Sequence, residues 1–332
     1  MKAIIPLAGM GSRLKPHTRT QPKSMIPLAG KPILGHIMDR LIGAGVTEFV
    51  FVIGYLGDRI EQYITENYGK YTSTYVIQIL GLGIGHAIWL AKDEFKGGQN
   101  MLVVLGDTIF ETDFTHVFSN RENVLGVKKV EDPRLFGVAE LNEDGIITKL
   151  VEKPSIPKSN LALVGLYYIQ QTTELFECLD YNIKNDIRTQ NEYHLTDALQ
   201  RMIDQGVVFK SFPVDVWFDC GKKDIILQTN KNLLKRVDQE LFRQFEKGNI
   251  IVSPVYIAPS AKIENSIIGP DVSIGEDAII KRSVLKNSII GQNAEINNVI
   301  LEDSLVGGDA RLLGSVHSLN IGDNAEINLR SS

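Results

Sequence analysis

The segment from Gly9 to Lys23 holds the residues of this chain best suited to bind an anion. It begins directly after a short apolar run, residues 3–7, which we expect to be a buried strand. Gly9 and Gly11 permit a sharp turn and leave the backbone amides open to a ligand. Arg13 and Lys23 add two positive charges. Amides and cations that converge where a strand ends predict a site for a highly charged anion, with a nucleotide polyphosphate favoured.

Two common phosphate-binding motifs do not fit this segment. The dinucleotide-binding fingerprint needs a third glycine where the chain has Leu14, and no Gly-Lys-Ser/Thr follows as in a P-loop. A tight turn is the simpler alternative for Gly-x-Gly alone. The longer pattern G-x-G-S-R-L-x-P-x-T-x-x-x-P-K is more specific, and with it the chain resembles the sugar-1-phosphate nucleotidylyltransferases. The resemblance covers residues 1 to about 224 and implies a nucleoside triphosphate and a sugar 1-phosphate as substrates.

Asp107 and Asp219 are the candidate metal ligands. Asp107 follows an apolar run, residues 101–105, where a carboxylate is placed to bind a hard cation; Asp219 lies in Trp-Phe-Asp-Cys-Gly. Mg²⁺ favours one or two carboxylates together with substrate phosphates. A helix N-cap or a turn is the local alternative for Asp107, and a structural turn is the alternative for Asp219. The resemblance makes both residues Mg²⁺ ligands, with Arg13, Lys23 and Asp107 as the catalytic residues.

The resemblance assigns further residues to the nucleotide. Gln78 would pair with the edge of a pyrimidine, and Gly83 would let the base approach the backbone. Ile84 stands where many relatives carry Thr, so a hydroxyl contact is lost, and His86 is expected to be a structural neighbour rather than a catalyst. The whole nucleotide-binding set is Leu7, Ala8, Gly9, Gly11, Ser12, Arg13, Gln78 and Gly83.

The sugar phosphate is assigned to a second set. Glu152 would accept hydrogen bonds from sugar hydroxyls and Lys153 would bind the phosphate, although a solvated surface pair is the alternative for this Glu-Lys dipeptide. Gly165 would leave room for the sugar ring, and Glu192 would line the sugar pocket or cap a helix. The whole sugar-phosphate-binding set is Gly137, Glu152, Lys153, Gly165, Tyr167 and Glu192.

Residues 1–224 alternate between short apolar runs and helix-like segments. The runs at 49–53, 75–79 and 101–105 are rich in β-branched residues, and 33–44 and 84–95 have helical periodicity. This alternation predicts an α/β catalytic domain with a Rossmann-like, mostly parallel sheet and helices on both faces. Ligands of such sheets bind beyond the carboxyl ends of the strands, where the Gly9 loop and Asp107 both fall.

The rest of the chain has a different periodicity. Residues 225–250 are predicted to be a connecting amphipathic helix. From 251 to 332, isoleucines recur at five- to six-residue intervals, several followed by Gly and a polar pair, as in Ile290-Gly291-Gln292-Asn293 and near the end at Ile321. Hexapeptide repeats predict a left-handed parallel β-helix, with about four coils of roughly eighteen residues each. The repeats are degenerate over 299–318, where we expect distortion.

Composition limits the partners and the location of the protein. A length of 332 residues suggests two domains, and a net charge of −5 without a basic run argues against nucleic acid and anionic membranes as partners. Cys178 and Cys220 form no metal-spaced pair, which fits a reducing cytosol. The N-terminus lacks the pattern of a signal peptide, and no apolar run reaches the length of a membrane span. We expect a cytoplasmic homo-oligomer, because solenoid flanks and ends are usually covered.

Several details sort the subfamilies. Residues 6–11 and 218–221 look most like bacterial glucose-1-phosphate uridylyltransferases, whereas 105–110 looks more like the thymidylyltransferases. UTP or dTTP with glucose 1-phosphate is therefore expected. Mannose-1-phosphate guanylyltransferase, N-acetylglucosamine-1-phosphate uridylyltransferase and a non-catalytic subunit that binds nucleotide sugars remain alternatives. A β-helix acyltransferase is the more distant alternative, since the predicted β-helix contains only His317 as a candidate base.

Overall fold

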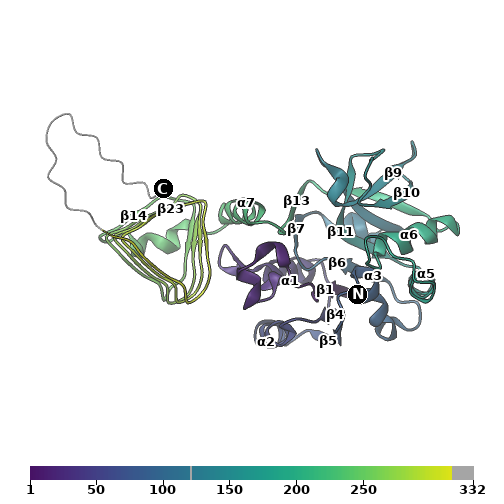
Figure 1. Cartoon of the computed structure of the whole chain (residues 1–332), viewed down its shortest axis with the longest axis horizontal. Coiled ribbons are helices and arrows are strands. Elements are labelled where there is room, and N and C mark those ends of the chain that lie inside the picture. Colours follow the sequence, from purple (N-terminus) through teal and green to yellow (C-terminus); the bar gives the residue numbers. More distant parts are fainter. Residues whose placement is uncertain (120–121, 316–332) are drawn as a thin grey trace. The chain divides into compact units, whose positions relative to one another are not determined.

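The chain divides into two compact units, Met1–Thr229 and Asn230–Ser332. The computed structural model describes residues 1–119 and 122–315 (Figure 1). Over this part of the chain, no helix has both the length and the apolar character needed to cross a membrane. The repeat at Ile321 and His317, both noted in the sequence, lie outside the described residues.

The first unit is built on a nine-stranded sheet in the order β10-β9-β11-β6-β1-β4-β5, with β8 and β12 joined to it through β11 (Figure 1). The parallel half, β5-β4-β1-β6, has the order of a Rossmann-like fold. The strands are β1 (Lys2–Pro6), β4 (Glu48–Ile53), β5 (Thr72–Ile77), β6 (Met101–Val104), β8 (Asn123–Lys129), β9 (Gly137–Leu141), β10 (Ile147–Glu152), β11 (Leu161–Ile169) and β12 (Phe209–Pro213).

The α/β prediction is confirmed, but the sheet is mixed rather than mostly parallel. Strand β11 runs antiparallel to β6, β8 and β9, and β9 runs antiparallel to β10. Antiparallel neighbours need only a short connection, and the five residues between β9 and β10 are too few for the crossover that a parallel pair requires. Apolar runs alone do not distinguish the two directions.

Helices cover both faces of this sheet. Ile4, Val50 and Val52 belong to a core shared with α3, α5 and α6, whereas Ala3 and Ile5 are buried on the opposite face of β1. Helices α1 and α2 contact each other through a hydrogen bond of 3.1 Å from the Tyr68 hydroxyl to the carbonyl of residue 35. The helices are α1 (Ile33–Gly43), α2 (Gly57–Tyr68), α3 (Ile84–Leu90), α4 (Phe114–Ser119), α5 (Thr172–Lys184) and α6 (Leu195–Asp204).

The predicted connecting helix over 225–250 is two separate segments. Helix α7 (Lys223–Leu234) ends at Leu234, and a 3₁₀ segment, η6 (Gln239–Phe245), follows. The Asp238 side chain caps η6, and the Gln239 amide bonds both the N–H and the carbonyl of Val255. Phe242 is buried in the core of the second unit. The apolar spacing therefore serves two elements, and the second one packs into the β-helix.

The second unit is a left-handed parallel β-helix, as predicted. Its described strands form three parallel four-stranded sheets, β14-β17-β20-β23, β15-β18-β21-β24 and β16-β19-β22-β25, and each of four coils contributes one strand to each sheet (Figure 1). The strands are β14 (Ile250–Ile251), β15 (Val255–Ile257), β16 (Lys262–Glu264), β17 (Ile267–Ile268), β18 (Val272–Ile274), β19 (Ile279–Lys281), β20 (Val284–Lys286), β21 (Ile289–Ile290), β22 (Glu295–Asn297), β23 (Ile300–Glu302), β24 (Leu305–Val306) and β25 (Arg311–Leu313).

Two predicted details of the β-helix are wrong. A coil has 16 or 17 residues instead of about eighteen, as in the pairs Ile279↔Glu295 and Ile250↔Ile267. Corner residues with positive φ, such as those at 271, 277, 282 and 287, recur after five or six residues, so some sides are one residue short of a hexapeptide. The expected distortion is also absent from β23, β24 and β25, which pair in register, because Leu301 and Val306 replace isoleucine in the core.

Candidate active site

The Gly9 loop lies at the carboxyl end of β1, where the strand order of the sheet reverses. Strand β4 pairs with one edge of β1 and β6 pairs with the other, so a crevice opens between the loops that follow β1 and β6. A cavity of about 880 Å³ occupies this position. Every residue predicted to bind the nucleotide lines it, together with Lys23, Ile84, Asp107 and Glu192.

The loop is fixed at Gly11 and open at Gly9. Gly11 has a φ of 60°, and a Cβ there would lie 3.0 Å from the side chains of both Lys23 and Thr18. The buried Thr18 hydroxyl donates a hydrogen bond of 2.9 Å to the Gly11 carbonyl. At Gly9, by contrast, no atom lies within 4 Å of where a Cβ would be. The backbone is therefore held in shape on one side and exposed to the cavity on the other.

Asp107 and Asp219 come together through a two-stranded antiparallel sheet. Strand β7 (Thr108–Glu111) pairs with β13 (Val216–Asp219), with Thr108 opposite Asp219, and the Cys220 N–H donates to the Asp107 carbonyl at 3.0 Å. Because Asp107 precedes a strand, the helix N-cap alternative is wrong for it. The pairing places both carboxylates beside the Gly9 loop.

A lysine lies between the two carboxylates and offsets part of their negative charge. The Lys23 ammonium contacts Asp107 Oδ2 and lies 3.7 Å from Asp219 Oδ1. Burial raises the pKa of Asp219, the negative charge of Asp107 raises it further, and Lys23 and Arg13 oppose the rise. At Gly221, a Cβ would lie 3.0 Å from Arg13 Nη2, so the missing side chain makes room for that guanidinium beside Asp219.

This pair of carboxylates fits Mg²⁺ with substrate phosphates as the remaining ligands. Their charges lie close enough to repel each other, and a cation already bridges them. Among the described residues, no group of three or more His, Cys, Asp or Glu side chains converges, as a site built only from protein ligands would require. Mg²⁺ binds in proteins through one or two carboxylates plus phosphate oxygens.

Gln78 is predicted to contact the base, and its hydrogen bonds determine which way its amide points. Its Nε2 donates to the Gly83 carbonyl at 3.2 Å and to His86 Nδ1 at 2.9 Å. A carbonyl only accepts, so the amide nitrogen is the atom that faces Gly83, and Oε1 remains as an acceptor for a ligand. His86 Nδ1 then accepts, which needs the neutral ring, and burial lowers the pKa of His86 accordingly. His86 thus orients Gln78.

Gly83 also has a packing role that the sequence did not predict. It has a φ of 99°, and a Cβ there would lie 2.6 Å from the Tyr193 carbonyl and 2.9 Å from Glu192 Cβ. The loop is tied to the same segment by backbone hydrogen bonds of 2.8 Å from Tyr193 to Leu82 and from Gly85 to Tyr193. Glu192 lines the cavity and does not cap α6, whose N-cap is His194.

Glu152, which is predicted to bind the sugar, is the centre of a buried polar cluster. Thr196 Oγ1 donates to Glu152 Oε2 at 2.7 Å, His194 Nδ1 lies 3.4 Å from Oε1, and Lys153 Nζ lies 3.7 Å from Oε1. A Cβ at Gly137 would lie 3.1 Å from Oε2 and 3.0 Å from Thr196 Oγ1. Gly137 therefore makes room for the hydrogen bond between Glu152 and Thr196. The alternative of a solvated surface ion pair between Glu152 and Lys153 is wrong, because the Glu152 side chain is only 10% exposed.

The other two predicted sugar residues are buried. Tyr167 belongs to the core; burial raises the pKa of its hydroxyl, and the charge of Glu152 adds to the rise. Gly165 does not leave room for a sugar ring as predicted. It has a φ of 80°, and the Leu105 side chain fills the space, only 2.7 Å from where a Cβ would be.

The sequence predicted no role for Thr18, His194, Thr196 or Gly221. The first three contact predicted residues, and Gly221 makes room for Arg13. Thr18 lies inside the phosphate-loop pattern, and His194 and Thr196 follow Glu192 closely. Their position within or next to a motif was the only sign in the sequence that these residues could matter. Which atom each side chain contacts depends on tertiary packing.

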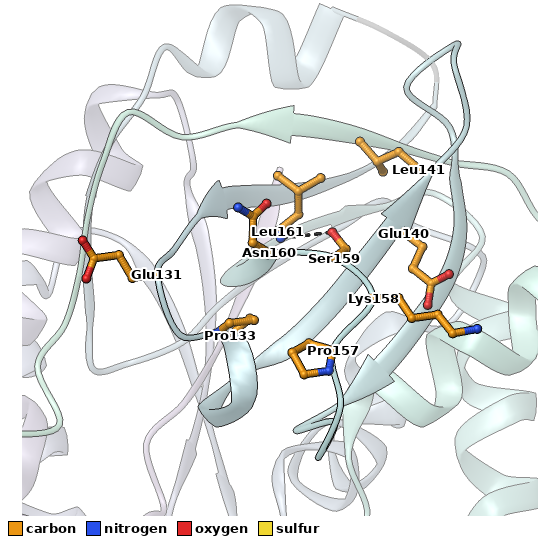
Figure 2. A pocket seen from close by; sticks show the side chains of 9 residues that line it. All are labelled: Glu131, Pro133, Glu140, Leu141, Pro157, Lys158, Ser159, Asn160 and Leu161. Atoms are coloured by element: carbon orange, nitrogen blue, oxygen red, sulfur yellow. Dashed lines mark hydrogen bonds between the residues drawn. The ribbon is translucent and has the colours of Figure 1, made fainter.

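A second cavity, of about 760 Å³, lies at the start of β11 and contains none of the predicted residues. Figure 2 shows Lys158 beside Glu140, whereas Glu131 lies on the opposite side. Ser159 Oγ is already occupied, because it accepts a hydrogen bond of 3.1 Å from the Leu161 N–H (Figure 2). The charged side chains that line this second cavity do not converge on one point. The cavity beside the Gly9 loop is therefore the candidate active site.

Two family models match the chain. One described as nucleotidyl transferase matches residues 2–236, and one described as GlmU-like, C-terminal hexapeptide matches residues 235–318. The bifunctional protein GlmU of Methanococcus vannielii is 34% identical over 322 residues, which cover 87% of this chain and 75% of that protein. A glucose-1-phosphate thymidylyltransferase of Streptomyces griseus is 29% identical over 317 residues, 87% of each chain.

The fold also matches a solved structure. A UDP-glucose pyrophosphorylase complexed with UDP-glucose aligns with a TM-score of 0.59 and 26% identity, covering 71% of this chain and 99% of that one.

Proposed function

This chain belongs to the nucleotidyl transferase family as a sugar-1-phosphate nucleotidylyltransferase, and from that premise we propose that it uses UTP or dTTP and glucose 1-phosphate. A phosphate oxygen of the sugar 1-phosphate attacks the α-phosphorus of the triphosphate. The bond to the β-phosphate breaks, and pyrophosphate leaves with the electron pair. The products are a nucleoside-diphosphate sugar and pyrophosphate.

Positioning and charge neutralisation account for the catalysis. The Gly9 loop offers its amides to the triphosphate, Arg13 neutralises the leaving pyrophosphate, and Lys23 and Lys153 hold the two reacting phosphates. Asp107 and Asp219 would hold Mg²⁺, which when bound neutralises phosphate charge. The observation that carries the proposal is that Arg13, Lys23 and Asp107 line the same cavity and that Asp219 lies beside them.

The free acceptor on Gln78 supports a pyrimidine with a ring N–H. Uracil and thymine present N3–H between two carbonyls, and Gln78 Oε1 is placed to accept from such a donor. Cytosine and adenine present a lone pair at the corresponding ring nitrogen. This acceptor would face Gln78 Oε1, which is also an acceptor, so no hydrogen bond would form. Guanine has an N1–H and stays an alternative that the substrate panel tests.

Pyrophosphate release from a panel of substrates tests the proposal. UTP, dTTP, GTP and CTP are each combined with glucose 1-phosphate, N-acetylglucosamine 1-phosphate and mannose 1-phosphate. We expect the highest kcat/KM with glucose 1-phosphate and UTP or dTTP. A clear preference for another sugar phosphate selects one of the alternative transferases, and no release with any pair favours the non-catalytic subunit. Acetyl-CoA with amino sugars, followed by thiol release, tests the acyltransferase.

Asp107→Asn tests the role of this carboxylate in the reaction. It should lower kcat by at least about 100-fold, the size of effect seen when one group that stabilises transition-state charge is removed. The exposed Asp144 provides a matched control, and Asp144→Asn should keep full activity. A fully active, folded Asp107→Asn protein would exclude this carboxylate from the chemistry.

We also propose that the β-helix packs against a second copy of the chain. Ile250, Ile267, Val284 and Ile300 lie in register along one sheet, and the three isoleucines are 58%, 36% and 80% exposed. A column of exposed β-branched residues on a flat sheet is a typical interface surface. Light scattering should give a mass above that of one chain, and Ile300→Lys should reduce it. Buried free thiols at Cys178 and Cys220 support the proposed cytoplasmic location.

A further inference from the structure

His194 lies between the carboxylates of Glu152 and Glu192, and a third carboxylate, Asp197, is close enough to interact with both His194 and Glu152. Nδ1 is 3.4 Å from Glu152 Oε1, and Nε2 is 3.8 Å from Glu192 Oε2. The side chain is 6% exposed, and Nε2 is fully buried with no hydrogen-bond partner. Leaving a buried polar atom unpaired is costly, so an unpaired nitrogen beside a predicted binding residue points to a role beyond packing.

The backbone around His194 is held firmly. The N–H of the preceding residue, Tyr193, donates to the Leu82 carbonyl in the loop before α3, and the Tyr193 carbonyl accepts from the Gly85 N–H in the first turn of α3, both at 2.8 Å. A Cβ at Gly85 would lie 2.7 Å from the Tyr193 carbonyl and 3.0 Å from the His194 carbonyl, so glycine permits this close approach. The imidazole therefore projects from a fixed segment between Glu152 and Glu192.

Glu152 is held on both of its oxygens. Thr196 Oγ1 donates to Oε2 at 2.7 Å, and His194 approaches Oε1. An ionised carboxylate has about four acceptor positions, so each oxygen keeps one for a ligand. Two acceptors at a fixed spacing suit two neighbouring hydroxyls of a polyol.

Glu192 is free to complete the arrangement. Its side chain is 48% exposed and lines the 880 Å³ cavity. Closing the gap of 3.8 Å to a hydrogen bond of about 2.9 Å needs only a small motion of this exposed side chain. In the imidazolium form both ring nitrogens donate, so a single ring bonds both carboxylates.

We propose that His194 is a positioning residue for sugar recognition, holding Glu152 through Nδ1 and Glu192 through Nε2 so that the two carboxylates accept the hydroxyls of the sugar 1-phosphate. This inference rests on the proposed function. It predicts that His194 affects the affinity for the sugar phosphate and leaves the affinity for the triphosphate unchanged.

Three substitutions test the roles of Nδ1 and Nε2 of His194 separately. His194→Asn places an amide N–H near the position of Nδ1, His194→Gln places one near Nε2, and His194→Phe keeps a ring without donors. The matched control is His36→Phe. His36 lies on α1, and its Nε2 forms a hydrogen bond of 2.7 Å with the Leu28 carbonyl, which the substitution removes. For each protein, kcat, both KM values and the melting temperature are measured, with calorimetric binding of glucose 1-phosphate as a readout that needs no turnover.

We expect His194→Phe to raise the KM and the Kd for glucose 1-phosphate about tenfold, the effect of losing one hydrogen bond to a charged group. The KM for the triphosphate should stay within about twofold, and His194→Asn should recover most of the loss because Glu152 is the less mobile carboxylate. His36→Phe should lower the melting temperature and leave both KM values unchanged.

Three results would overturn the inference. They are an unchanged Kd for glucose 1-phosphate in His194→Phe, an equal rise in both KM values, and an Asn variant no better than Phe. Wild-type turnover is scored separately: an inactive wild type that still binds glucose 1-phosphate through His194 contradicts the proposed reaction only, whereas a wild type that does not bind it contradicts the inference as well.

Discussion

Replacing Lys23 with methionine tests the central electrostatic arrangement of the site. The Lys23 ammonium contacts Asp107 and lies 3.7 Å from Asp219, and the three side chains are 12%, 33% and 28% exposed. A fully exposed ion pair contributes about 0.2–1 kcal/mol, and removing one partner of a buried pair costs about 3–5 kcal/mol. These partly exposed groups fall between the limits. We therefore expect Lys23→Met to lower the free energy of unfolding by about 1–3 kcal/mol in metal-free buffer.

The assay compares thermal unfolding with and without Mg²⁺. Each 1 kcal/mol shifts the melting temperature of a domain of this size by about 2–4 °C. Without Lys23, the two carboxylates lose the cation that competes with a metal, so Mg²⁺ should stabilise Lys23→Met more than the wild type. Turnover should fall by about 100-fold or more, because a positive charge on the reacting phosphates is lost.

The ion pair between Lys31 and Asp39 on the surface provides the control. Lys31→Met removes an exposed ion pair of 2.6 Å with Asp39 and should cost no more than about 1 kcal/mol, with no change in the Mg²⁺ response. If Mg²⁺ stabilises Lys23→Met no more than the wild type, Lys23 does not neutralise the carboxylates. If turnover is unchanged, Lys23 does not hold a phosphate.

Two further predictions concern the neighbouring groups. Gly137→Ala places a Cβ 3.1 Å from Glu152 Oε2, which should weaken the bond to Thr196 and raise the KM for the sugar phosphate about tenfold with little change for the triphosphate; equal changes in both KM values would contradict this. The raised pKa of Asp219 means that the folded state binds its proton more tightly than the unfolded state, so ionisation of Asp219 destabilises the fold at neutral pH and the penalty disappears as pH falls through that raised pKa. Asp219→Asn should therefore be more stable than the wild type at pH 7 without metal, with the difference lost near pH 4, although it should be inactive; thermal unfolding across this pH range checks the sign.

Local patterns predicted much of the fold, and physical reasons explain where they failed. Strand and helix periodicity identified the parallel strands β1, β4 and β6, because buried faces impose a spacing on nearby residues, but it placed β5 at 75–79 instead of Thr72–Ile77. They did not show that β11 is antiparallel, since an apolar run has no direction. The helix predicted over 225–250 ends at Leu234 because Asp238 caps a new segment and Phe242 enters another core.

The sequence by itself determined the shape of the Gly9 loop and the β-helix, since both depend on residues that are close in the chain. Gly11 needs positive φ, and the isoleucine repeat needs only inward positions at a short period. Only the tertiary structure decided which side chains contact one another in the site. Asp219 reaches Asp107 through the register of β7 and β13, and His194 faces Glu152 because α6 starts beside β10. Such contacts join residues distant in sequence, and the free energy that selects them comes from packing of the whole unit rather than from any local pattern.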